Sequence, residues 1–138
     1  MMKYMRKRKD LGITGGMARW YDKNSRESRM AELSGYAKEI STLIKPAATG
    51  EKRRILEIAP GPGYISIELS KLGDYTITGM DISADFVEIA RANAKRENAG
   101  VDFTRGNVSA MPFDDAAFDF LFCSAAFKNF HDPERALR

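Results

Sequence analysis

The chain has 138 residues, of which 43% are hydrophobic, and a formal net charge of +3 at pH 7. This length suits one hydrophobic core, the single cysteine excludes an internal disulfide, and no apolar run is long enough to cross a membrane. The N-terminus also lacks the apolar segment of a signal peptide, so we expect one domain over residues 1–138, with the cytoplasm as its compartment and no membrane partner.

The excess positive charge lies mainly in the first ten residues, where five lysines and arginines are offset only by Asp10. Such a run can contact RNA phosphates or an anionic membrane surface. No aromatic platform or recognition module accompanies it, so a solvated tail is the favoured interpretation and nucleic acid is not the expected substrate.

The periodicity of apolar residues then predicts the elements in chain order. One helix precedes the first strand, with an apolar stripe at Met30, Leu33, Ala37, Ile40 and Ile44 and a stop at Pro46. Short apolar strands alternate with amphipathic helices after it, which predicts an α/β fold with a parallel sheet and right-handed crossovers. The expected strands are 54–58, 76–81, 101–105 and 117–123, and the expected helices are 64–72, 84–97 and one starting at 133.

A glycine-rich turn connects the first strand to the next helix. Strand, turn and helix N-terminus direct backbone N–H groups at one point, which is typical of nucleotide-type cofactor sites. The dinucleotide fingerprint G-x-G-x-x-G is incomplete, because Ser66 replaces its third glycine. Glu57 lies at the end of the strand, where a carboxylate suits an ammonium group better than a pyrophosphate.

The pattern Glu57-x-Ala59-x-Gly61-x-Gly63 resembles the E/D-x-G-x-G-x-G motif of class I S-adenosylmethionine-dependent methyltransferases. Alanine stands for the first glycine at Ala59, which tolerates a positive φ less well and alters the backbone approach to the methionine moiety. A tight turn that merely ends a buried strand is the alternative for this motif taken alone. A nicotinamide-dependent enzyme is disfavoured by Ser66 and Glu57.

The second strand ends in Asp81, about twenty residues beyond the glycine turn, where a carboxylate binds the two ribose hydroxyls. Ile82 resembles the apolar residue that packs on the adenine ring in this family. Asp81 also suits a helix cap, but Ser83 is expected to perform that role and to leave Asp81 for the ligand.

After the third strand, the family turn usually carries an acid that binds the adenine amino group, and Asn107 replaces it here with an uncharged acceptor. The alternative for Asn107 is a turn residue that tolerates left-handed φ. The next backbone N–H, of Val108, is implied to bind a ring nitrogen. With Ser124 after the fourth strand, the implied cofactor contacts are Glu57, Ala59, Pro60, Gly61, Gly63, Asp81, Ile82, Asn107, Val108 and Ser124.

The segment from Met111 to Ser124 resembles the family stretch that leads into strand four, and the loop after it resembles that of the branch that methylates quinone precursors and other small molecules. His131 is a candidate base in that loop, although an exposed residue beside a helix cap explains it more simply. Trp20 and Tyr21, in a segment spanning residues 1–24 that comprises the basic tail and a candidate lid, either cover the cofactor pocket or anchor the first helix. Cys123 is expected to be a core thiol, and no catalytic residue or metal site is predicted.

The resemblance implies a Rossmann-like doubly wound sheet of which strands one to four are present and the C-terminal strands of the usual seven are missing. An uncovered fourth strand with Phe118, Phe120 and Phe122 on one side predicts self-association through that edge if the chain is complete. The expected function is methyl transfer from S-adenosylmethionine to a small-molecule acceptor. The alternative is a truncated cofactor-binding module without activity that self-associates.

Overall fold

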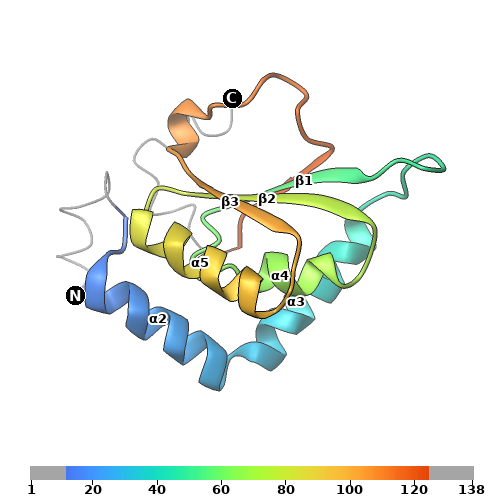
Figure 1. Ribbon diagram of the computed structural model, residues 1–138. Helices are drawn as coiled ribbons and strands as arrows, with labels where there is room; N and C mark the ends of the chain where they lie inside the picture. Colours follow the sequence, from blue (N-terminus) through green and yellow to red (C-terminus); the bar gives the residue numbers. More distant parts are fainter. Residues whose placement is uncertain (1–11, 125–138) are drawn as a thin grey trace.

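The computed structural model describes residues 12–124 (Figure 1). Its elements are α2 (Gly15–Ser28), α3 (Met30–Leu43), β1 (Arg53–Ile58), α4 (Tyr64–Ser70), β2 (Tyr75–Asp81), α5 (Ala84–Arg96), β3 (Val101–Arg105), a short 3₁₀ helix η1 (Val108–Ala110) and β4 (Phe120–Phe122). The basic tail up to residue 11, the helix expected from residue 133 and the candidate base His131 lie outside the described residues.

The four strands form one parallel sheet in the order β3-β2-β1-β4. Ile55 of β1 pairs with Ile77 of β2 on one side and with Phe120 of β4 on the other. The α/β, Rossmann-like prediction is therefore confirmed, and the part of the chain that the structure describes contributes four strands, against the seven usual in the family. The chain leaves β1 toward β2 and β3 and returns to the other side of β1 with β4, so the strand order reverses at β1.

The helices α2, α3, α4 and α5 lie on one face of this sheet, and η1 lies on the other (Figure 1). The larger core cluster fills the space between them and the strands, with Ile55, Ile67, Leu69, Ile77 and Ala90 all at most 1% exposed. The opposite face carries a smaller cluster of Leu56, Ile58, Met80 and Val108, covered by the loop between β3 and β4. β1 is therefore buried on both faces from Ile55 to Ile58, which explains why apolar residues occupy successive positions there, interrupted only by Glu57.

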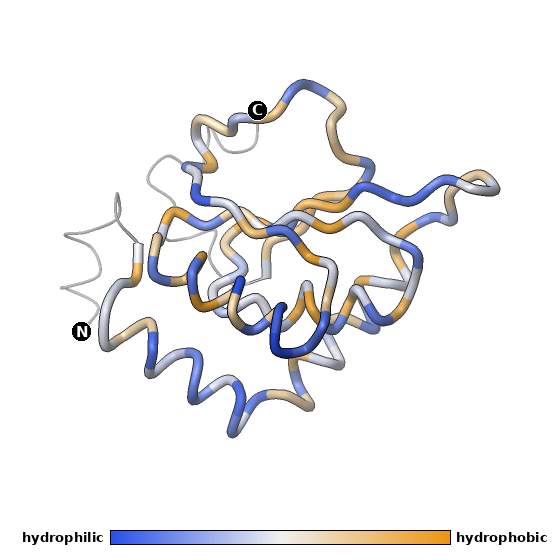
Figure 2. The backbone as a smooth tube through the Cα atoms, in the orientation of Figure 1, coloured by the Kyte–Doolittle hydropathy of each residue, from blue (hydrophilic) through white to orange (hydrophobic). Residues whose placement is uncertain are grey.

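Within the described residues, two helices precede β1, whereas the apolar stripe predicts only one. α2 was missed because it is largely hydrophilic, as Figure 2 shows, and it buries only Ala18 and Ser25. Two helix-weakening glycines also open it. α2 and α3 are separated at Arg29, whose φ of −123° and ψ of 2° are not helical.

β4 is shorter than the predicted strand over 117–123. It begins after Asp119, whose carboxylate accepts the Arg54 backbone N–H at 2.8 Å and binds the Arg54 guanidinium at 3.1 Å. The residues before it form a turn in which Ala116 adopts a φ of +59°. Leu121, 48% exposed, lies in this edge strand. Self-association through the edge stays a prediction.

Candidate cofactor-binding site

The carboxyl ends of the parallel strands meet at one edge of the sheet, and the strand order reverses there between β1 and β4. Ligands of open α/β sheets bind in the crevice outside such a reversal. The edge brings together the turn after β1, Asp81 at the end of β2 and Asn107 shortly after β3, and Ser124 follows β4 by two residues. The sequence-predicted site residues therefore come from segments that the topology places side by side.

The glycine-rich turn has three residues with left-handed backbone. Ala59 has a φ of +55°, Gly61 of +56° and Gly63 of +85°. The Ala59 N–H donates to the Met80 carbonyl of β2 at 2.8 Å, and the Gly63 N–H donates to the Pro60 carbonyl at 3.0 Å. The positive φ of Ala59 agrees with the expectation that alanine is a strained replacement for the family glycine at this position.

Close packing explains why Gly63 carries no side chain. A Cβ at this position would lie 2.5 Å from the Phe103 ring of β3 and 3.1 Å from the Ala90 Cβ of α5. At Gly61, by contrast, an added Cβ would come no closer than 3.9 Å to the Phe86 ring. The turn is therefore fixed to the sheet at Gly63 and has more space at Gly61.

Asp81 links the turn to β2. One carboxylate oxygen accepts the Gly61 N–H at 3.0 Å and the other accepts the Ser83 N–H at 2.9 Å. Burial raises the pKa of this carboxyl, and the two backbone hydrogen bonds counteract the rise. Ser83 caps α5, since its hydroxyl accepts the Phe86 N–H at 3.1 Å, so the cap assignment is confirmed.

Glu57 lies beneath the turn rather than at its open side, because only 1% of its surface is exposed. The Ser66 hydroxyl of α4 donates to it. Desolvation raises the pKa of Glu57 to about 7, with hydrogen bonds from Ser66 opposing the shift and the charge of Asp81 adding to it. The contact of Glu57 with an ammonium group stays a prediction. Ser66, which replaces the third glycine of the dinucleotide fingerprint, binds Glu57, and the sequence did not indicate this role.

Asn107 is extended, with a φ of −97°, so the interpretation as a left-handed turn residue is wrong. Its side-chain oxygen accepts the Ser109 N–H at 2.9 Å and caps η1. A carbonyl oxygen has two lone pairs, which leaves one acceptor site for an adenine amino group. Val108 is buried in the smaller core cluster, and both adenine contacts stay predictions.

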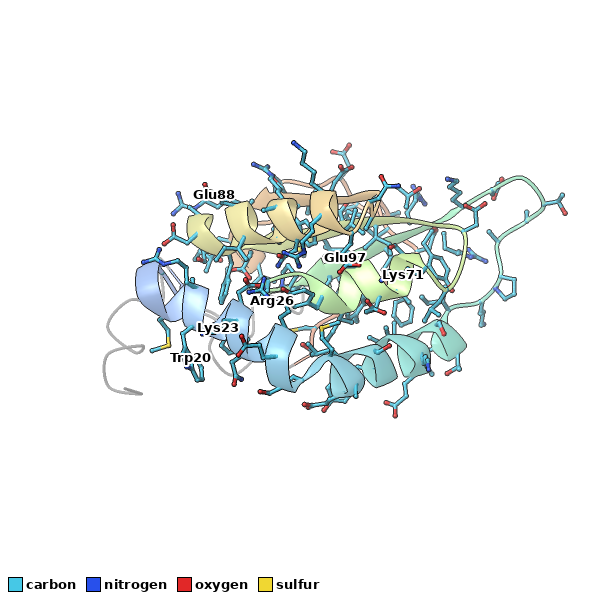
Figure 3. All side chains as sticks on the ribbon, turned by 60° about the horizontal axis from the view of Figure 1, so that its bottom comes forward. Trp20, Lys23, Arg26, Lys71, Glu88 and Glu97 are labelled. Carbon is cyan, nitrogen blue, oxygen red and sulfur yellow. The ribbon has the colours of Figure 1, made fainter. Side chains whose placement is uncertain are left out.

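Contacts of α2 were not found from the sequence. The Asp22 carboxylate accepts the Tyr64 hydroxyl at 2.7 Å and the Asn93 side-chain amide at 2.9 Å. Tyr21 packs edge-on against Phe86, with ring centroids 5.8 Å apart, which is a contact that an anchor would make. Trp20 is 55% exposed and points outward from α2 (Figure 3). An apolar stripe has a helical periodicity that the sequence shows, whereas polar anchors such as Asp22 have none.

Residues 12–124 contain no group of three or more histidine, cysteine, aspartate or glutamate side chains that could hold a metal ion. Within the same range, no helix has the length and apolar character needed to span a membrane.

Comparison with known proteins identifies the family. A family model described as "methyltransferase domain" matches residues 56–138, more than half of the chain. The chain belongs to this methyltransferase family. A demethylmenaquinone methyltransferase of Deinococcus radiodurans is 33% identical over 86 residues, which cover 62% of this chain and 36% of that protein. The matched part of this chain thus covers well under half of the length of that curated relative.

Solved structures agree with this assignment. A putative S-adenosyl-L-methionine-dependent methyltransferase from Methanococcus maripaludis superposes with a TM-score of 0.77 over 92% of this chain and 60% of its own, at 24% identity, and so shows the fold. The YcgJ protein of Bacillus subtilis has a TM-score of 0.66 and 27% identity, over 78% of this chain and 43% of its own. The resemblance to class I S-adenosylmethionine-dependent methyltransferases is confirmed.

The residues at the edge of the sheet suit the cofactor that this family uses. A carboxylate offers about four lone-pair sites, and the Gly61 and Ser83 N–H groups use one on each Asp81 oxygen. One site per oxygen is left for two vicinal hydroxyls of a ribose. Gly61 itself is buried, and a Cβ there would be in ordinary contact with the Phe86 ring, so its N–H serves to hold Asp81 in place.

Proposed function

We propose that this methyltransferase domain binds S-adenosylmethionine at the carboxyl edge of its sheet and serves methyl transfer to a small-molecule acceptor. The hydrogen bond from the Gly61 N–H to Asp81 carries this proposal. It joins the glycine-rich turn to the acid at the end of β2, so one contact holds together the two segments that would bind the methionine and ribose parts. The strand order reverses at the same place.

Each predicted residue has a role in this proposal. Asp81 accepts the ribose hydroxyls, Ile82 packs on the adenine ring, and Asn107 accepts the adenine amino group beside the Val108 N–H. The turn from Ala59 to Gly63 holds the methionine part, Glu57 attracts its ammonium group from below, and Ser124 closes the site after β4. Bound S-adenosylmethionine supplies an electrophilic methyl group, and the residues of this chain hold and orient it and exclude water.

Quinone precursors are the acceptor class to test first, since relatives named demethylmenaquinone methyltransferases match this chain. No described residue is assigned as a catalytic base. Orientation of the acceptor suffices where it needs to lose no proton.

Calorimetry on the whole chain tests the cofactor site with S-adenosylmethionine, its homocysteine product and NAD side by side. We expect both sulfur compounds to bind and NAD not to bind. Asp81→Asn keeps the size of the side chain but removes one acceptor oxygen and the charge, so the affinity for the homocysteine product should fall about 100-fold, the value of two charged hydrogen bonds.

Asp74→Asn is the matched control, since Asp74 is an exposed acid just before the amino end of the same strand and pairs with Lys52. Its affinity should equal that of the parent chain. Unchanged affinity in Asp81→Asn would contradict the ribose assignment.

A second candidate function is cofactor binding without turnover, in a chain that self-associates through β4. The exposure of Leu121 in this apolar edge strand favours the self-association. Transfer of a labelled methyl group from S-adenosylmethionine to a quinone precursor would exclude it, whereas binding without transfer would support it. Sedimentation at high protein concentration tests the association, and a monodisperse monomer would contradict it.

A further inference from the structure

Asn93 of α5 is a buried polar side chain directly behind the glycine-rich turn. Only 2% of its surface is exposed. Its amide nitrogen donates to the Pro62 carbonyl at 3.0 Å and to the Asp22 carboxylate at 2.9 Å. Its amide oxygen accepts from the Arg96 guanidinium at 2.9 Å. One side chain therefore joins the turn, α2 and the last turn of α5.

These partners allow only one orientation of the amide. Both N–H groups face acceptors, the Pro62 carbonyl and the Asp22 carboxylate, while the oxygen faces the cationic Arg96. A rotation of the amide by 180° would place its oxygen against two acceptors and its N–H groups against a cation. Asp22 and Arg96 thus determine how Asn93 presents its donor to the turn.

The turn needs such an anchor at Pro62. Proline has no N–H, so its carbonyl is the only backbone hydrogen-bonding group that Pro62 offers. Asp81 holds the turn from β2 through Gly61, and Asn93 holds it from α5 through the next residue. The two contacts come from different elements and fix the peptide group before Gly61 and the peptide group before Gly63, so each fixed group directly precedes a residue with left-handed φ.

α2 takes part through Asp22, whose carboxylate accepts from both Tyr64 and Asn93. Tyr64 is the first residue of α4, directly after the turn. α2 lies alongside α5 on the same side of the sheet (Figures 1 and 3). A helix that precedes the family match by nearly thirty residues therefore reaches the back of the glycine-rich turn.

We propose that Asn93 is a positioning residue that fixes the Pro62 carbonyl of the glycine-rich turn, and that Asp22 of α2 orients Asn93 and so couples α2 to cofactor affinity. The affinity part rests on the proposed function, whereas the positioning part concerns the ligand-free chain. Asn93 and Asp22 are not expected to contact the cofactor themselves.

Amide hydrogen exchange in the ligand-free chain tests the positioning part. Asn93→Ala leaves the buried Pro62 carbonyl without its donor, so the Gly61 and Gly63 amides should exchange about tenfold faster relative to the Ile55 amide of β1. This ratio separates local loosening from lower global stability, which would accelerate all slow amides together. Tyr64→Phe removes the hydrogen bonds of the Tyr64 hydroxyl with Asp22 and Arg96 but leaves the bond from Asn93 to Pro62, so it should leave the ratio unchanged.

Calorimetry with S-adenosylhomocysteine tests the coupling. We expect its affinity to fall about tenfold in Asn93→Ala, by a smaller factor in Asp22→Ala, where Arg96 still orients the amide, and by less than about twofold in Tyr64→Phe. An exchange ratio in Asn93→Ala equal to that in Tyr64→Phe would overturn the positioning role. Unchanged affinity in Asp22→Ala would overturn the coupling of α2.

If the parent chain binds no S-adenosylhomocysteine, the proposed function and the affinity part fail together. The positioning role of Asn93 is then decided by hydrogen exchange alone.

Discussion

Acidic side chains at the amino ends of the strands, the amino edge of the sheet, have different partners from those at the carboxyl ends, the carboxyl edge. At the amino ends of the strands, Asp119 pairs with Arg54 at 3.1 Å and Asp74 pairs with Lys52 at 3.3 Å. Hydrogen bonds from Arg54 lower the pKa of Asp119 to about 2. At the carboxyl ends, burial raises the pKa of both Glu57 and Asp81, and no ion pair to either acid is found within residues 12–124.

This difference shows which edge is built for a ligand. Acids at the amino edge are neutralised by cations of the same chain and join neighbouring strands. The acids at the carboxyl edge, Glu57 and Asp81, are buried away from water, and their hydrogen-bond donors are a hydroxyl group and backbone N–H groups. A ligand that brings hydroxyl donors and positive charge would stabilise these acids, and its binding would stabilise the folded domain by mass action.

The largest expected effect is on the pH dependence of stability, through Glu57. Because its pKa rises from an ordinary 4.5 to about 7 in the folded chain, the stability associated with its protonated form is complete below pH 4.5 and is lost as the pH rises through 7. The loss should amount to about 3 kcal/mol. Glu57→Gln cannot ionise, so urea unfolding between pH 4.5 and 8 should show that much less loss than the parent chain.

Asp119→Asn is the control from the opposite edge. The folded pKa of Asp119 is depressed, so its contribution is present above the ordinary value of 3.8 and is lost as the pH falls toward 2. Between pH 4.5 and 8 this variant should be less stable than the parent chain by a constant amount, so that the two profiles run parallel, and it should lose less stability than the parent chain in acid. Parallel profiles for Glu57→Gln and the parent chain over the neutral range would contradict the contrast between the edges.

The second prediction compares two glycines that have nearly the same positive φ. Gly63 at the carboxyl edge has a φ of +85°, and Gly50 in the loop before β1 has a φ of +83°. A Cβ at Gly63 would lie 2.5 Å from Phe103, whereas a Cβ at Gly50 would meet nothing within 4 Å. Both Gly→Ala variants incur the cost of positive φ, so their difference in unfolding free energy isolates the overpacking, which should be about 2 kcal/mol.

Equal destabilisation of Gly63→Ala and Gly50→Ala in urea would show that the turn is not held against Phe103. The glycine-rich turn would then owe its shape to backbone conformation alone.

Much of the carboxyl edge of the sheet could be predicted from the sequence, because it depends on local patterns. The strand that contains Glu57, the turn through Gly63 and the position of Asp81 at the end of β2 follow from apolar runs, glycine spacing and the meeting of parallel strand ends. The Ser83 cap is equally local, because its partner Phe86 is three residues away.

The remaining features depend on contacts between distant residues. Asp22 lies 71 residues from Asn93 and 42 from Tyr64, and no spacing rule links them. α2 was missed for the related reason that its polar side chains hold it to the domain while its apolar stripe is weak. The burial of Glu57 under the turn likewise depends on how α4 packs, which placed Ser66 against it.

The smallest expected effect concerns two alanines with left-handed backbone. Ala59 in the glycine-rich turn has a φ of +55°, and Ala116 in the loop before β4 has a φ of +59°. Glycine relieves this strain but gains entropy in the unfolded chain, so Ala59→Gly and Ala116→Gly should each raise the unfolding free energy by only about 0.5 kcal/mol.

Affinity separates these two variants where stability does not. Ala59 borders the proposed methionine site, so glycine there should allow closer backbone approach and tighten S-adenosylhomocysteine binding about twofold to fivefold, measured by calorimetry. Ala116 precedes β4 at the amino edge, so its variant should bind like the parent chain. If Ala59→Gly gains stability but no affinity, the cost of the alanine is confined to folding. The alanine that replaces the usual glycine of the family at position 59 would then have no effect on cofactor affinity.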